Sequence, residues 1–280
     1  MVTLTSNQAI QPRFRAIDGL SIRYAESEDR GDHALLLGPW PESLLCYAPT
    51  WSRLAERTHL VAIDLPGFGH SERRDALMSP HEMGRFIIRV ADEFGLENPH
   101  VVGPDVGTDA ALFAAALSPG RLRSLVVGSG GAAVPIQLGG ALKDWVEDPD
   151  FEHYRNADPR KIVAAALATI ERYKIPADIY EDYLSAYEGD RFFESMRYVR
   201  TYPDQLPVLR DLLPGIQTPV LNIAGGHDRA VPPVNSEFLH QRLPHSKLDI
   251  LDAGHFTWED SPDEYAALIT TWWAGGYATV

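Results

Sequence analysis

The segment from His100 to Leu112 constrains the fold of this chain more than any other. It begins with a short apolar run that is typical of a buried β-strand, and it ends in an alanine-rich stretch that is typical of a helix. Between them lies a Gly-x-Asp-x-Gly turn, in which Gly103 and Gly107 stand two residues before and after Asp105. Small residues at these positions let a strand turn sharply into a helix. The sequence therefore predicts a strand–turn–helix unit that exposes a carboxylate.

Strand-like runs alternate with helical patterns along most of the chain. The expected strands are Ser21–Ala25, His33–Leu37, Leu60–Asp64, His100–Gly103, Leu122–Gly128, Pro219–Ala224 and Lys247–Leu251. The expected helices are Pro80–Phe94, Thr108–Leu117, Val234–Arg242 and Pro262–Trp273. The central strands are nearly continuous in Val, Ile and Leu, as parallel strands covered on both faces are. The pattern predicts an α/β fold with a mostly parallel, doubly wound sheet.

An Asp18-Gly19 pair joins the run Phe14–Ile17 to the first expected strand. This dipeptide is a strong signal for a tight two-residue hairpin, so an antiparallel pair is expected at the N-terminal side of the sheet.

The alternation stops between residues 134 and 213, where the chain is helical in character. The clearest helical stretches are Ile162–Tyr173, Asp178–Tyr187 and Asp190–Val199, and prolines separate them. The segment is also rich in tyrosine. We interpret it as a helical cap inserted into a core of residues 1–133 and 214–280. Such a cap would cover the carboxyl edge of the sheet, where open α/β sheets bind ligands.

Composition narrows the class of protein and its partners. Acidic residues outnumber basic ones by 39 to 25, which gives a formal net charge of -14 over 280 residues. An acidic chain is a poor partner for nucleic acid or an anionic membrane, so we expect a small-molecule substrate. The sequence lacks metal-ligand spacing and a glycine-rich phosphate loop, so no cofactor and no metal are expected. Composition does not indicate an oligomeric state.

Cys46 is the single cysteine and cannot form an internal disulfide, so it is interpreted as a packing residue. The segment Met1–Ile10 lacks the basic start and apolar core of a signal peptide, and no apolar run is long enough to span a bilayer. The expected location is the cytoplasm.

Two further polar residues follow strands on the same edge of the expected sheet. Asp228 comes after the strand that begins at Pro219, and His255 comes in the loop after the next strand. The carboxyl ends of parallel strands meet at one edge, so Asp105, Asp228 and His255 are expected to lie together. In such a triad the histidine activates water, and the second acid fixes its tautomer and stabilises the imidazolium.

The identity of the first triad member restricts the chemistry. A carboxylate that attacks an acyl carbon would give a reactive anhydride, whereas attack on a saturated carbon gives a stable alkyl ester. The expected electrophile is therefore an epoxide or a carbon–halogen bond. Thr108 and Asp109 are expected only to satisfy the start of the following helix. Ser129 lies in a Gly-rich turn before the cap and is interpreted as a turn or pocket residue.

With these motifs in place, the chain resembles the α/β-hydrolases of the epoxide hydrolase and haloalkane dehalogenase group, which share an aspartate nucleophile. The resemblance rests on the stretch Asp64-Leu65-Pro66-Gly67-Phe68-Gly69-His70-Ser71, the turn at Asp105, and the loops of Asp228 and His255. Where the family carries His-Gly-x-Pro, this chain carries Gly38-Pro39-Trp40-Pro41. The resemblance implies an oxyanion hole made by the backbone N–H groups of Trp40 and Val106.

The same resemblance bears on the substrate. Many members carry a tryptophan directly after the nucleophile to hold a halide, and Val106 in that position counts against a dehalogenase. Epoxide hydrolases use two cap tyrosines to protonate the leaving oxygen, and Tyr154 and Tyr198 match them by spacing. The sequence thus favours epoxide hydrolysis without a cofactor. Three alternatives remain: a hydrolytic dehalogenase, an ester or lactone hydrolase that uses Asp105 as a base, and a ligand-binding or biosynthetic accessory protein without turnover.

Overall fold

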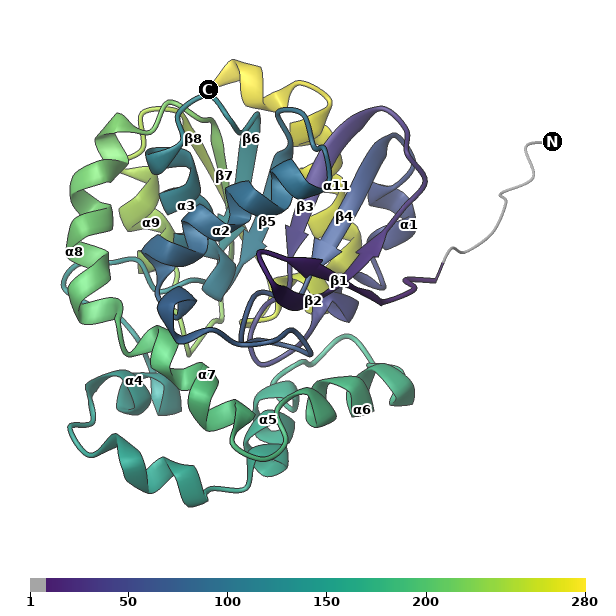
Figure 1. Cartoon of the computed structure of the whole chain (residues 1–280). Coiled ribbons are helices and arrows are strands. Elements are labelled where there is room, and N and C mark those ends of the chain that lie inside the picture. The colour runs from purple at the N-terminus through teal and green to yellow at the C-terminus, as the bar shows by residue number, and fades with distance from the viewer. Residues whose placement is uncertain (1–8) are drawn as a thin grey trace.

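The computed structural model describes residues 9–280, which form one eight-stranded sheet flanked by helices (Figure 1). The strands are β1 (Arg13–Ile17), β2 (Leu20–Glu26), β3 (Asp32–Leu37), β4 (Thr58–Ile63), β5 (His100–Pro104), β6 (Ser124–Gly128), β7 (Val220–Gly225) and β8 (Ser246–Leu251). Their spatial order is β1-β2-β4-β3-β5-β6-β7-β8.

The sheet has the expected mixed character. Strands β3 to β8 pair in parallel, whereas β2 pairs antiparallel with β1 and with β4. Asp18 and Gly19 both have positive φ in the turn between β1 and β2, as a tight hairpin requires. All residues of β4, β5, β6 and β7 are buried, which explains their continuous apolar sequences. The predicted α/β fold is confirmed.

Helices cover both faces of the sheet. The core helices are α1 (Trp51–Leu54), α2 (Pro80–Glu93), α3 (Val106–Leu117), α9 (Val234–His240), α10 (Thr257–Asp260) and α11 (Pro262–Trp273). In Figure 1, α2 and α3 lie in front of the strands and α11 lies behind them. The sequence placed the start of α3 at Thr108, but the helix begins at Val106, directly after Asp105. The turn is therefore tighter than expected.

Five α-helices lie between β6 and β7. They are α4 (Gly140–Glu147), α5 (Pro159–Leu167), α6 (Ala177–Ala186), α7 (Arg191–Val199) and α8 (Tyr202–Leu212). Helix α5 ends six residues before the predicted boundary at Tyr173. The sequence did not predict α8 because of its prolines. Pro203 lies in its first turn, where a missing N–H costs nothing, and Pro207 is tolerated inside it.

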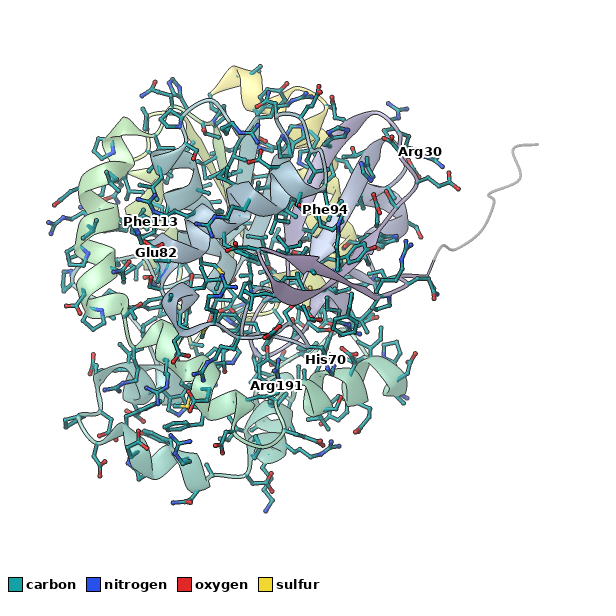
Figure 2. All side chains as sticks on the ribbon, viewed as in Figure 1. Arg30, His70, Glu82, Phe94, Phe113 and Arg191 are labelled. Carbon is teal, nitrogen blue, oxygen red and sulfur yellow. The ribbon has the colours of Figure 1, made fainter. Side chains whose placement is uncertain are left out.

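The five α-helices between β6 and β7, which we call the cap helices, do not all lie in one layer. Helices α4 to α7 form a layer at the carboxyl edge of the sheet, whereas α8 runs back along the core beside α3 (Figure 1). His70 and Arg191 lie at the junction of core and cap (Figure 2). There Arg191 Nη2 donates to the carbonyl oxygens of Gly69 at 2.6 Å and Ser71 at 3.0 Å.

Two expectations concern the chain ends and membranes. The segment Met1–Ile10, which the sequence predicts not to be a signal peptide, lies mostly within residues 1–8, outside the described residues. Within residues 9–280, no helix has both the length and the apolar character needed to cross a bilayer.

Gly103→Ala should destabilise the protein by about 1–3 kcal/mol, the usual cost of overpacking a tight site. A Cβ atom at Gly103 would lie 2.6 Å from the carbonyl oxygen of Gly107 and 3.2 Å from Cδ1 of Leu37. Chemical denaturation would measure the loss. Gly215→Ala is the matched control, because a Cβ there meets no atom within 4 Å. Equal stability of the two variants would contradict this account of the turn.

Candidate active site

The backbone at Asp105 is held in a conformation that residues other than glycine rarely adopt. Its φ is 52° and its ψ is -123°, between the end of β5 and the start of α3. The Asp105 N–H donates to the carbonyl of Gly128 in β6 at 2.9 Å. The Thr108 hydroxyl lies 3.1 Å from the Gly103 carbonyl and 2.9 Å from the Gly128 carbonyl. These bonds tie the turn to two adjacent strands, which is how such strain is maintained.

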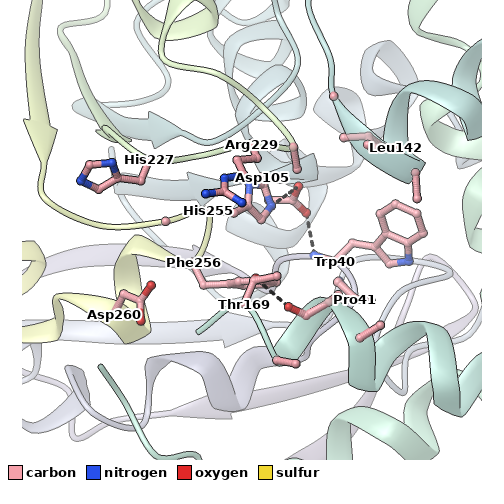
Figure 3. A pocket seen from close by; sticks show the side chains of 18 of the residues that line it. Trp40, Pro41, Asp105, Leu142, Thr169, His227, Arg229, His255, Phe256 and Asp260 are labelled. Atoms are coloured by element: carbon pink, nitrogen blue, oxygen red, sulfur yellow. Dashed lines mark hydrogen bonds and ion pairs between the residues drawn. The ribbon is translucent and has the colours of Figure 1, made fainter. Parts of the chain in front are cut away.

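The two oxygens of the Asp105 carboxylate have different surroundings. Oδ2 accepts a hydrogen bond from the Trp40 backbone N–H at 2.7 Å, and Oδ1 lies 3.6 Å from Nε2 of His255. Figure 3 shows Asp105 between these two residues. Val106 is the first residue of α3, so its N–H has no acceptor within the helix. Oδ2 is therefore fixed by the Trp40 N–H, and Oδ1 faces the histidine.

The imidazole of His255 is held from its far side. Its Nδ1 lies 2.8 Å from Oδ2 of Asp228, and Oδ1 of Asp228 accepts from the N–H groups of Ala230 at 2.9 Å and Val231 at 2.8 Å. The Ser129 hydroxyl donates to the His255 carbonyl at 3.0 Å. Asp105, His255 and Asp228 thus lie next to one another in that order, as expected for a triad. Ser129 supports the histidine loop rather than providing a nucleophile.

The neighbouring carboxylates strongly shift the pKa of the His255 imidazole. Burial by itself would lower the pKa of this imidazole, but Asp228 and Asp105 outweigh that effect and raise its pKa to about 10. The imidazolium is therefore favoured while both neighbouring carboxylates carry charge. Removing the charge of either neighbour would lower the pKa and release a neutral base.

A cavity of about 1030 Å³ opens beside this triad. Trp40 and Pro41 line it on the core side, and the cap side consists largely of small or apolar residues of α4 and α5 and the segment after α5. These cap residues include Ala141, Leu142, Trp145, Ile162, Ala165, Ala166 and Ala168. Polar residues of the lining are Asp105, Lys161, Thr169, Glu171, Arg172, His227, Arg229, His255 and Asp260. The cavity suits a sizeable, largely apolar molecule whose reacting atom reaches Asp105.

The structure does not bring the two tyrosines suggested by spacing to this cavity. Tyr198 is completely buried, and its hydroxyl donates to the carbonyl of Val106 at 2.9 Å. The Tyr154 hydroxyl donates to Asp148 at 3.1 Å within the cap. Neither tyrosine lines the cavity, nor does any other tyrosine of residues 9–280. Spacing along the chain missed this because it does not report which face of a helix points inward.

The expectation for Asp109 was wrong. Thr108 does bind backbone groups, but neither carboxyl oxygen of Asp109 has a hydrogen-bond partner, and the residue is fully buried in α3. Burial raises the pKa of Asp109 well above its usual range, and the nearby Asp105 adds to the effect. Burial thus favours the neutral form of Asp109, and its side chain makes no hydrogen bond to the helix start.

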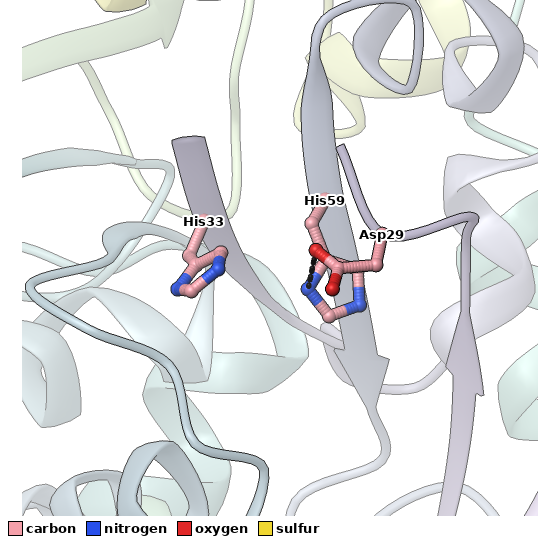
Figure 4. Close-up of side chains that lie close together, drawn as sticks. All are labelled: Asp29, His33 and His59. Atoms are coloured by element: carbon pink, nitrogen blue, oxygen red, sulfur yellow. Dashed lines mark ion pairs between the residues drawn. The ribbon is translucent and has the colours of Figure 1, made fainter. Parts of the chain in front are cut away.

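One group of potential metal ligands lies apart from the cavity, although the sequence shows no metal-type spacing. Asp29, His33 and His59 gather near the starts of β3 and β4 (Figure 4). His59 Nε2 lies 3.1 Å from Glu26 Oε1, and its Nδ1 lies 3.8 Å from Asp29 Oδ1. Nδ1 of His33 already accepts from the Glu97 N–H at 2.9 Å, which leaves its other nitrogen protonated in the neutral ring. That protonated nitrogen of His33 cannot bind a metal ion, so the group offers only two ligands, from Asp29 and His59.

Comparison with known proteins agrees with this architecture. Residues 36–262 match the family described as the alpha/beta hydrolase fold. A putative carbamate hydrolase, RutD, of Caulobacter sp. (strain K31) is 30% identical over 250 residues, which are 82% of this chain and 85% of that protein.

Solved structures extend the likeness to the whole chain. A lipase described as putative, from Acinetobacter baumannii AYE, has a TM-score of 0.81 at 16% identity, covering 97% of this chain and 93% of its own. The epoxide hydrolase VrEH1 from Vigna radiata has a TM-score of 0.77 at 15% identity, covering 96% and 99%. At such identities these likenesses concern the fold.

The chain therefore belongs to the α/β-hydrolase fold family. Together with its curated relatives, the family assigns the protein to the hydrolases.

The raised pKa of His255 predicts a pH-dependent contribution to stability. A histidine whose folded pKa exceeds its unfolded value stabilises the fold fully below the unfolded pKa of about 6.5, and this contribution is lost as pH rises through about 10. The stability difference between the wild type and His255→Gln should therefore shrink between pH 6.5 and 10, as measured by urea denaturation. His227→Gln, an exposed residue, is the control. A difference that stays constant or grows would contradict the prediction.

Proposed function

We propose that this hydrolase opens epoxides through a covalent alkyl ester on Asp105, with His255 and Asp228 completing the catalytic triad. The observation that carries the proposal is the 2.7 Å hydrogen bond from the Trp40 N–H to Asp105 Oδ2. In an enzyme that attacks acyl carbons, the oxyanion donors must be free to bind the substrate carbonyl. Here Oδ2 of the proposed nucleophile Asp105 already accepts from the Trp40 N–H. This arrangement suits a carboxylate nucleophile, and it weighs against ester cleavage with Asp105 as a base.

In the first step, Oδ1 of Asp105 attacks a saturated carbon of the epoxide and a carbon–oxygen bond breaks. Oδ2 becomes the carbonyl oxygen of the new ester and stays bound to the Trp40 N–H. The leaving oxygen departs as an alkoxide, which must take a proton from water or from a donor of the cavity lining. The cationic lining residues are Lys161, Arg172 and Arg229, and they would stabilise that developing charge.

Esterification prepares the second step, because it removes the charge of Asp105. One of the two carboxylates that raise the pKa of His255 is thereby lost, so the imidazole gives up its proton more readily. The neutral ring then takes a proton from water, which attacks the ester carbonyl carbon. The oxyanion forms on Oδ2, where the N–H groups of Trp40 and Val106 can stabilise it. Collapse of this intermediate releases the diol and restores the Asp105 carboxylate.

Hydrolytic dehalogenation is the second candidate, and one observation favours it. No tyrosine of the described residues lines the cavity, and a halide leaves without needing a proton. The residue after Asp105 disfavours dehalogenation, because the Val106 side chain has no donor that could bind a halide. The two reactions share Asp105, His255 and Asp228, so they differ only in the leaving group.

His255→Gln should trap the covalent ester, because attack by Asp105 does not need the histidine base but hydrolysis does. Intact-protein mass spectrometry after incubation with a panel of epoxides and haloalkanes would detect the adduct. An epoxide adds its full mass, whereas a haloalkane adds its mass less that of the hydrogen halide, so the same spectrum identifies the electrophile. His255→Gln/Asp105→Asn is the control and should stay unmodified. An unmodified His255→Gln protein with a substrate that the wild type turns over would refute the proposal.

A single turnover in ¹⁸O-water should label Asp105 and leave the product unlabelled. Water attacks the ester carbonyl carbon, so the solvent oxygen stays on the carboxylate and the product receives an original oxygen of Asp105. Mass spectrometry of the peptide that contains Asp105, and of the product, would separate the two outcomes. Label in the product of that first turnover would mean that Asp105 only activates water, and the ester or lactone reaction would then become the better candidate.

A further inference from the structure

Two glutamates that the proposed reaction does not use meet in the interior behind the catalytic loops. Glu42 lies two residues after Trp40, and Glu259 lies four residues after His255 in α10. Both side chains are completely buried, and they lie within hydrogen-bonding reach of each other. The pair therefore connects the segment that supplies the Trp40 N–H to the segment that supplies the catalytic imidazole.

The outer oxygens of the pair each have a neutral donor. Trp258 Nε1 donates to Oε2 of Glu42 at 2.8 Å, and the Tyr183 hydroxyl of α6 donates to Oε1 of Glu259 at 3.0 Å. The remaining oxygens, Oε1 of Glu42 and Oε2 of Glu259, have no donor among the described residues. Two carboxylates would therefore leave two buried acceptors unpaired.

Nothing nearby compensates a double negative charge. Among residues 9–280, neither glutamate forms an ion pair with a lysine, arginine or histidine. Within the described residues, the titratable groups that face the pair are neutral donors or further acids: Cys46, Tyr47, Tyr173, Tyr183, Asp105 and Asp260. Two like charges in a buried site cannot both persist, so the pair must hold a proton. One proton held by the pair supplies a donor where both residues otherwise offer only acceptors.

The electrostatic surroundings assign that proton to Glu42. Burial raises the pKa of Glu42 well above its usual range, and the charge of Glu259 adds to the effect. Burial also raises the pKa of Glu259, to about 7, while the hydrogen bonds from Glu42 and Tyr183 limit the rise. Burial and the neighbouring charge thus favour the proton on Glu42, so that Glu42 donates and Glu259 accepts.

The cap also reaches this pair. The hydroxyl of Tyr187, the residue directly after α6, donates to the backbone carbonyl of Glu42 at 2.9 Å. This hydroxyl also accepts from the Gly69 N–H at 3.0 Å. Together with Tyr183, this fixes the Trp40–Glu42 segment to the cap and to α10 at once. A shift of that segment would move the Trp40 N–H away from Asp105, and a shift of α10 would move the His255 loop.

We infer that Glu42 is a protonated carboxylic acid whose hydrogen bond to Glu259 positions the Trp40 N–H and the His255 imidazole for the reaction at Asp105. Glu42 and Glu259 are positioning residues, since neither lines the cavity. The expected effect on kcat rests on the proposed function, whereas the proton on Glu42 and the position of the imidazole do not.

A pair of substitutions at Glu42 tests the inference. Glu42→Gln keeps one donor and one acceptor, as a protonated acid does, and should retain kcat within about threefold. Glu42→Met keeps the approximate size but removes the acceptor of Trp258 Nε1 and leaves Glu259 with only the Tyr183 hydroxyl as a donor. It should lower kcat on the order of 10- to 100-fold with little change in KM, the scale of loss when reacting groups are misplaced. Equal damage by both substitutions, or none by Glu42→Met, would overturn the positioning role.

Infrared spectroscopy tests the proton without any substrate. At pH 8, the wild type should show the C=O stretch of a protonated carboxyl that is absent from Glu42→Gln. Asp109→Asn is the matched control, because it removes a different buried neutral carboxyl and should leave the Glu42 band in place. The absence of a band that depends on Glu42 would overturn the assignment of the proton.

The position of the imidazole has its own signature in proton NMR. The Nδ1–H of His255, which faces Asp228 at 2.8 Å, should give a low-field resonance in the wild type and in Glu42→Gln. That resonance should shift or broaden in Glu42→Met, and an unchanged resonance would contradict the coupling. Both spectroscopic tests stand even if no ester forms on Asp105, and ester trapping stands if Glu42 proves ionised, so the two failures are distinguishable.

Discussion

The site depends on the hydrogen bond between the Trp40 N–H and Oδ2 of Asp105. This bond is possible only because the backbone at Asp105 has a positive φ, which turns the carboxylate out of the end of β5 toward the neighbouring loop. The strain is held by the Gly128 carbonyl and by the Thr108 hydroxyl. A conformation that costs on the order of 1–3 kcal/mol is thus maintained by the sheet itself. The position of the carboxylate is set before any substrate enters.

With Asp105 fixed, the proposed reaction would take the charge of the site through a simple cycle. Asp105 and Asp228 stabilise the imidazolium of His255 in the free protein, and in the proposed reaction the loss of the Asp105 charge on esterification would withdraw part of that support. The same histidine can therefore rest as a cation and act as a base one step later. A serine in place of Asp105 would not produce this change, since its hydroxyl is neutral before and after acylation. The carboxylate thus serves both as the proposed nucleophile and as the group that adjusts the base.

The sequence predicted the parts of the fold that local patterns control. Apolar strand runs, the Asp18-Gly19 hairpin and the small residues around Asp105 all act over a few residues, and the structure has the corresponding elements. Prolines misled the prediction at α8, because a proline in the first turn of a helix reads in the sequence as a break. The start of α3 was misjudged because Val106 and Gly107 are poor helix formers, and the strand pairing of the turn overrides that preference.

The sequence predicted only those site residues whose place follows from the order of the strands along the chain. Asp105, Asp228 and His255 each follow a parallel strand, so the topology brings them to one edge. The tyrosines are different, because helix rotation decides where a side chain points, and Tyr198 turns to the Val106 carbonyl instead of the cavity. Glu42 and Glu259 are 217 positions apart in the sequence, and no local pattern links them. Only packing reveals that two acids share one buried space.

The cap divides into a half that is anchored and a half that forms the cavity. Asp182 of α6 accepts from Arg23 of β2 at 2.6 Å and from the Ser43 hydroxyl at 2.7 Å, in largely buried positions. Burial opposes ionisation of Asp182, but its bonds to His70, Arg23 and Ser43 prevail and lower its pKa. Breaking such a pair on one side would leave a buried charge, so α6 is costly to move. Helices α4 and α5 have no comparable ionic anchor to the core within residues 9–280, yet they supply the apolar wall of the cavity. Substitutions in α4 and α5 can therefore change which molecule fits while α6 keeps the Trp40–Glu42 segment, and with it Asp105, in place.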